Sequence, residues 1–163
     1  MTDLTDTGTS LREASDTEIY RRLAPELIRF ATALVGPADA PDVLSTAFMK
    51  AIAAPGWPMV DNHRAYLYRA VLNVAHTHRR RRFQRRDLEA RTASGPHWDL
   101  PNLHPHVRDA VLRLSVRQRA VIVLTYWSDL DPPTVATHLG ISEGAVRRHL
   151  ARARARLREA LDA

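Results

Sequence analysis

Apolar residues recur at steps of three and four over residues 16–35, which is the pattern of an amphipathic helix. Its apolar positions are Ile19, Leu23, Leu27, Phe30, Ala31 and Leu34. Ser15-Asp16-Thr17-Glu18 ahead of them has the form of a capping box, and Gly36-Pro37 ends the helix. Residues 1–15 are polar and acidic, so we expect a disordered arm there.

Two more helices are predicted in the first half of the chain. Asp39 caps the second helix, and Pro55-Gly56-Trp57-Pro58 breaks it. Its apolar face carries Val43, Leu44, Ala47, Phe48 and Ile52. The third helix begins at Asp61 or Asn62, has apolar positions up to Ala75, and continues into residues 79–86, where six of eight residues are arginine.

Residues 87–105 show no apolar period and contain Gly95, Pro96, Pro101 and Pro105, which is typical of a linker. Beyond them, short helices are predicted over about 106–114, 116–127 and 132–139, and a long one to about 161. The pattern therefore predicts an all-α fold: two small helical domains, 16–86 and 106–163, joined by a flexible linker.

The last two helices have the spacing of a helix-turn-helix. Ala136 lets the helices cross closely, Gly140 permits the sharp turn, and Val146 fills the core between them. Ser142 caps the second helix, and recognition helices present that N-terminal end to the major groove of DNA. The buried stripe of this helix is predicted to be Val146, Leu150, Ala153, Leu157 and Leu161.

Charge, cysteine content and the length of apolar runs narrow the classes of function that the chain can have. The net charge is +6, and all basic residues except Lys50 are arginine, which favours bidentate contacts to phosphate and guanine, although genomic base composition is an equally good explanation. The absence of cysteine excludes disulfides and thiolate metal sites and fits the cytoplasm. No apolar run approaches the roughly 20 residues of a membrane span, so no membrane contact is expected.

Neither a metal, a cofactor nor an enzyme activity is predicted. His97, His104 and His106 lack acidic or thiol partners at regular spacing. The chain also has no glycine-rich phosphate loop and no nucleophile–base arrangement.

Four stretches carry a family resemblance. Residues 64–73, Arg-Ala-Tyr-Leu-Tyr-Arg-Ala-Val-Leu-Asn, with the arginine run after them, resemble the aromatic segment, asparagine and basic tail of the extracytoplasmic-function (ECF) sigma factors. Residues 38–44 with Phe48 are similar to that family's polymerase-binding helix. Residues 114–124 and 144–154 are similar to the start and the recognition helix of its C-terminal domain.

The resemblance implies that residues 16–86 bind the clamp helices of core RNA polymerase and melt the promoter −10 element. Residues 106–163 would recognise the −35 element as duplex and meet the polymerase flap, and an anti-sigma factor stays open as a partner. The −10 candidates are Trp57, His63, Arg64, Tyr66, Arg69, Asn73, Arg79, Arg80, Arg81 and Arg82. The −35 candidates are Arg119, Ser142, Glu143, Gly144, Arg147, Arg148 and Arg152, and the polymerase candidates are Asp39, Asp42, Leu44, Ser45 and Phe48.

The sequence leaves alternatives open, both for the function of the chain and for the roles of single residues. A helix-turn-helix regulator that does not act as a sigma factor explains the second half but leaves the basic, aromatic third helix unexplained. Ser45 stands where the family usually has glutamine, so a sigma-shaped interaction protein without initiation activity is a further alternative. For single residues, Trp57 is either a packing anchor or a base stacker, and Asn73 is either a base contact or merely exposed.

Overall fold

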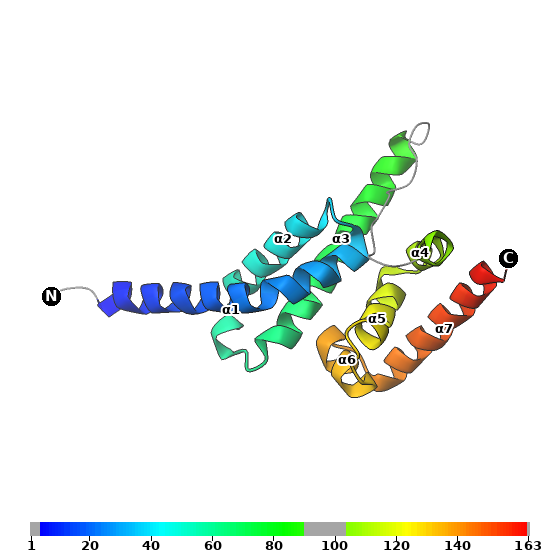
Figure 1. The fold of residues 1–163 in the computed structure, drawn as a ribbon. Helices are drawn as coiled ribbons and strands as arrows, with labels where there is room; N and C mark the ends of the chain where they lie inside the picture. The colour runs from blue at the N-terminus through cyan, green and yellow to red at the C-terminus, as the bar shows by residue number, and fades with distance from the viewer. Residues whose placement is uncertain (1–3, 90–103, 163) are drawn as a thin grey trace.

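The structure is a computed structural model that describes the backbone of residues 4–89 and 104–162, and the side chains of 15–82, 104 and 106–162. All regular structure in these residues is helical (Figure 1). The elements are α1 (Leu4–Val35), α2 (Ala40–Ala53), the 3-10 helix η1 (Trp57–Met59), α3 (His63–Glu89), α4 (Pro105–Leu112), α5 (Val116–Tyr126), α6 (Pro132–Leu139) and α7 (Glu143–Leu161). The predicted all-α fold is confirmed.

Helices α1, α2 and α3 pack against one another and form the N-terminal domain. Gly36, with φ +98°, ends α1 as predicted. The side-chain oxygen of Asn62 accepts a hydrogen bond from the backbone N–H of Ala65 at 2.9 Å, so Asn62 supplies the side-chain cap of α3. Helices α4 to α7 form the C-terminal domain, in which α7 packs against α4, α5 and α6.

Three local predictions differ from the structure. Helix α1 begins at Leu4, so no disordered arm is found from that residue on, and Asp16 lies within the helix, where its carboxylate accepts a hydrogen bond from the Trp57 indole. Asp39 is at the N-cap position of α2 but makes no cap bond, because its carboxylate pairs with Arg82 at 2.6 Å. Helix α3 continues to Glu89, and residues 90–103 of the predicted linker lie outside the described part.

The helix-turn-helix is confirmed. The side chains of Asp131 and Ser142 cap α6 and α7, respectively. Between the two helices Gly140 has φ +65°, the left-handed conformation that glycine adopts most easily. Val146 is fully buried, as a residue that fills the core between the helices must be.

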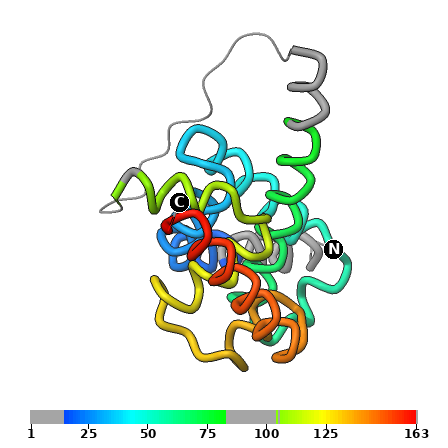
Figure 2. Tube along the Cα trace, turned by 90° about the vertical axis from the view of Figure 1, so that its right-hand side faces the viewer, coloured from blue at the N-terminus to red at the C-terminus, as the bar shows by residue number. Residues whose placement is uncertain are grey.

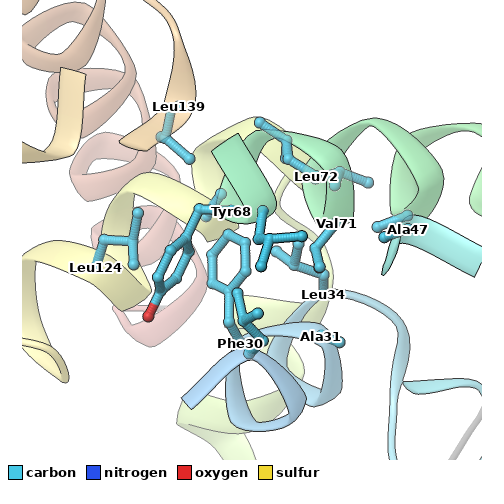
Figure 3. Packing of buried hydrophobic residues seen from close by; sticks show 14 of the residues in the cluster. Phe30, Ala31, Leu34, Ala47, Tyr68, Val71, Leu72, Leu124 and Leu139 are labelled. Carbon is cyan, nitrogen blue, oxygen red and sulfur yellow. The ribbon is translucent and has the colours of Figure 1, made fainter. Parts of the chain in front are cut away.

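The two domains share one hydrophobic core instead of standing apart. Phe30 and Leu34 of α1 and Tyr68 of α3 belong to the same buried cluster as Leu124 of α5 and Leu139 of α6 (Figure 3). Helix α6 packs against α3, and α5 packs against α1. The relative position of the domains is therefore fixed by apolar packing.

Arg119 of α5 lies at the centre of this junction and is only 1% exposed. Its guanidinium donates hydrogen bonds to the backbone carbonyls of Leu34 at 2.9 Å and Leu112 at 2.8 Å, and longer bonds to those of Ala33, Val111 and Leu114. The carbonyls in the last turn of a helix have no partner within it and carry partial negative charge. Arg119 supplies donors to the last turns of both α1 and α4.

Burial lowers the pKa of Arg119 to about 9, with a further contribution from the nearby positive charge of Arg79. The guanidinium therefore stays protonated near neutral pH. Its hydrogen bonds to carbonyls offset the cost of removing the charge from water.

We predict that Arg119→Leu lowers the free energy of unfolding by about 3 kcal/mol, because it leaves several buried carbonyls without a donor. Urea denaturation followed by circular dichroism measures this change. Arg117→Leu, on an exposed position of the same helix, is the control and should change stability by less than about 0.5 kcal/mol. An equal, small effect of both substitutions would contradict the structural role of Arg119.

Candidate nucleic-acid interfaces

A groove of about 410 Å³ lies between α2 and α3 and contains the predicted Asn73. The side chain of Asn73 is exposed, and its amide can both donate and accept hydrogen bonds. Tyr66 and Arg69 line the same groove, and the guanidinium of Arg69 lies 5.9 Å from the centre of the Tyr66 ring. Lys50 on α2 adds a positive charge to the groove. The structure thus brings three of the −10 candidates together in one positively charged groove.

Trp57 is not available to a base. It is 2% exposed, and its ring makes edge contacts with Phe48, His63 and Tyr66. The hydrogen bond to Asp16 uses its one polar atom. Trp57 therefore anchors η1 against α1, α2 and α3, and its prediction as a base contact is wrong in this structure. His63 is partly buried beside it.

Arg64 is exposed, but its charge is already paired. It donates two hydrogen bonds to the carboxylate of Glu26, at 2.9 and 2.6 Å, and so joins α3 to α1. The bond to Glu26 raises the pKa of Arg64. The paired charge makes Arg64 a weaker phosphate ligand than an unpaired arginine.

The four arginines of the run whose side chains are described, Arg79–Arg82, divide into two pairs. Arg79 is partly buried and donates to the carbonyls of Leu112 and Leu114, while Arg82 pairs with Asp39. Burial lowers the pKa of Arg79. Arg80 and Arg81 are exposed, and no hydrogen bond or ion pair to another described residue is found for either. Among these four described arginines, Arg80 and Arg81 are therefore the two that are available to contact phosphate.

The predicted polymerase contacts on α2 are only partly exposed. Asp42 and Ser45 lie on the surface, and Phe48 is partly covered. Leu44 is 2% exposed and belongs to the core, so its prediction as a surface contact is wrong. Met49, which the sequence analysis did not single out, is 59% exposed and completes a face at positions 42, 45 and 49.

The N-terminal end of α7 presents the second set of polar side chains. Ser142, Glu143, Gly144, Arg147, Arg148 and Arg152 are all exposed. Arg147 donates to Glu143 one turn earlier, at 3.2 Å. The buried Arg119 lies apart from this surface, so the prediction that it contacts DNA is wrong here.

A second groove, of about 730 Å³, lies in the C-terminal domain between α4, α5 and α7. Tyr126 and Trp127 at the end of α5 are about half exposed there, and Leu161, which was expected to be buried, is 48% exposed. Arg154 donates a 2.7 Å hydrogen bond to the Tyr126 hydroxyl. An apolar groove with aromatic residues and a basic border is typical of a protein-binding surface. The sequence analysis did not predict this groove. The two adjacent aromatic residues Tyr126 and Trp127 at the end of a helix could have indicated it.

Within the described residues, no helix has both the length and the apolar character that crossing a bilayer requires. Nor does that part of the chain bring three or more histidine or acidic side chains together as a metal site would require.

Comparison with protein families matches both domains. Residues 19–85 match the family described as sigma-70 region 2, and residues 106–157 match sigma-70 region 4. Among curated proteins, the chain is 33% identical over 151 residues to the RNA polymerase sigma-E factor of Streptomyces coelicolor, covering 88% of this chain and 84% of that protein. It is also 33% identical over 156 residues to the sigma-E factor of Streptomyces antibioticus, covering 89% and 83%.

Solved structures of sigma factors are also similar to this chain. The chain is similar to the sigma factor RpoE of Bartonella quintana, crystallised with the anti-sigma factor NepR, with a TM-score of 0.67, 25% identity and 90% and 96% of the two chains covered. It is also similar to CnrH in complex with the cytosolic domain of CnrY, with a TM-score of 0.59, 26% identity and 92% and 89% covered. The region matches, the sigma-E relatives and the shared two-domain fold show that this chain belongs to the ECF sigma factor family.

Proposed function

We propose that the N-terminal domain opens the −10 element with the groove around Asn73, and that the C-terminal domain recognises the −35 element with the exposed end of α7. One observation carries the proposal: a single chain holds a capped recognition helix with exposed arginines and a separate basic groove with an exposed amide. Melting requires both positive charge for phosphates and a polar site for an unstacked base. A helix-turn-helix regulator would need only the first of these two surfaces.

Polymerase binding has two candidate surfaces. The exposed face of α2 with Asp42, Ser45 and Met49 would meet the clamp helices, and the groove beside Tyr126 and Trp127 would meet the flap. An anti-sigma factor, the partner present in the similar solved structures, would have to cover the same surfaces to block polymerase. The protein would act in the cytoplasm by binding, without catalysis of its own.

We predict that Asn73→Ala slows open-complex formation while leaving duplex binding and core-polymerase binding within about twofold of the parent. The amide lies in the groove and makes base hydrogen bonds only after a strand separates, so its loss affects melting alone. Permanganate footprinting on matched and mutated −10 elements measures melting, and the effect should be largest on the best −10 sequence.

His76→Ala, an exposed change three residues along the same helix, is the control and should melt templates as the parent does. Equal melting of every template by Asn73→Ala and the parent would remove Asn73 from the base site.

For the −35 element we predict different effects of two adjacent arginines. Arg148 is exposed, and no hydrogen bond or ion pair joins it to another described residue, whereas Arg147 is held by Glu143. Arg148→Ala should therefore weaken binding to the preferred duplex by about 1–3 kcal/mol and relax the preference at one base pair. Fluorescence anisotropy on a panel of single-base duplex variants measures both.

Arg158→Ala, at the far end of α7, serves as the matched loss of charge and should weaken binding equally on every duplex. If Arg148→Ala behaves in the same way as Arg158→Ala, Arg148 is a phosphate contact and not a base contact.

A further inference from the structure

Helix α7, orange to red in Figure 2, packs against α5, and basic side chains of the two helices meet there. The guanidinium of Arg156 donates a 3.1 Å hydrogen bond to the side-chain oxygen of Gln118, which also completes the capping box of α5. His149 and Arg152 precede Arg156 by seven and four residues, so all three lie on one face of α7. That face therefore runs along the N-terminal end of α5, where Arg117 is exposed.

His149 lies among cations at this contact. Its side chain is partly buried, whereas Arg117, Arg148 and Arg152 are exposed. Burial lowers the pKa of His149 below its ordinary value of 6.5, and the positive charges of Arg117, Arg152 and Arg148 lower it further. Helices α4 and α6 also pack against α7, but they contribute no charged group to this effect, and no described carboxylate offsets it. The ring is therefore neutral in the free chain at neutral pH.

The protein does not neutralise the arginines of this cluster. Within the described residues, no hydrogen bond or ion pair is found for Arg117, Arg148 or Arg152, and the nearby Glu143 pairs with Arg147. An α-helix of about 10–12 Å diameter nearly fills a major groove about 12 Å wide, so the phosphates of a bound duplex pass along its flanks. The flank of α7 that faces α5 carries the cluster, and guanidinium groups match phosphate oxygens well.

We propose that Arg117 and Arg152 bind a phosphodiester group of the duplex beside the recognition helix, and that the imidazole of His149 takes up one proton from solvent when they do. The phosphate brings negative charge into the cluster and so favours the charged form of the ring. The protonated ring can then donate a charge-assisted hydrogen bond. Duplex and proton therefore strengthen each other's binding. The proposal rests on the proposed function in one respect, that α7 meets duplex DNA.

Duplex affinity should consequently rise as the pH falls. Above the pKa that His149 has in the complex, neither the free nor the bound chain holds the proton, and the affinity is constant. Below it the complex takes up the proton first, and the gain is complete below the lower pKa of the free chain. A difference of one between the two pKa values is a factor of ten, so we expect Kd to fall about three- to tenfold from about pH 8 to about pH 6.

Fluorescence anisotropy with a labelled duplex of about 20 base pairs and fixed mixed sequence measures this Kd for the full chain, because phosphate contacts do not depend on sequence. His149→Gln should lose most of the pH dependence and bind throughout about as the parent does at the alkaline end. His149→Arg carries a permanent charge, so it should bind throughout about as the parent does at the acid end. His106→Gln, at an exposed position of α4, is the control and should keep the parent's profile.

The histidine can also be observed directly. NMR titration of the His149 ring protons, assigned by their loss in His149→Gln, gives its pKa with and without the duplex. We expect the pKa to be higher in the complex. Arg117→Gln should reduce this difference and lower the slope of log Kd against log salt by about one, because one phosphate ligand is lost. Circular dichroism checks that each variant keeps the helical content of the parent.

Two results would overturn the proposal: the same pH profile for the parent and His149→Gln, or a His149 pKa that the duplex leaves unchanged or lowers. Failure of the proposed function gives a different result. A chain that shows the proton uptake but supports no transcription keeps this phosphate site and loses its assignment as an initiation factor. A chain that supports transcription without the proton uptake keeps that assignment and loses the site.

Discussion

The guanidinium of Arg119 places a positive charge where the last turns of α1 and α4 expose carbonyl oxygens to the interior. Each of these groups would be costly to bury alone: the cation loses water, and the carbonyls lose their donors. Together they satisfy one another and fix α5 against the end of α1. The orientation of the C-terminal domain, and so the position of α6 and α7 relative to the groove around Asn73, depends on this cluster together with the apolar packing between the domains.

The same cluster connects the domain junction with the arginine run at the end of α3. Arg79 reaches it from α3, and its charge disfavours the protonated form of Arg119. Two guanidinium groups thus share the backbone carbonyls of Leu112 and Leu114.

Features set by neighbours in the sequence were predictable. The helix-turn-helix followed from Ala136, Gly140 and Val146, because a tight turn between two crossing helices requires small and apolar residues at fixed spacing. The all-α fold followed from apolar periodicity in the same way. Asn73 was predicted as a candidate and lies in a groove, although its contact with a base stays a prediction.

Features set by distant partners were not predictable. Arginine is almost never fully buried, so no local pattern marks Arg119 as the residue that holds Leu34, 85 positions away. Asp39 has the right residue type for a cap, yet Arg82 takes its carboxylate. Trp57 was open to either role, and its burial against three aromatic rings required the packed structure.

The central claim is that this chain directs initiation and does not merely bind DNA. The most direct measurement is run-off transcription with sigma-free core RNA polymerase and genomic promoter fragments. The account predicts discrete transcripts that appear only when the chain is added and that are lost when either the −10 or the −35 element is changed. Binding to −35 duplexes without any transcript from a range of promoters would contradict it, and would instead indicate a protein that has the sigma fold but not its activity.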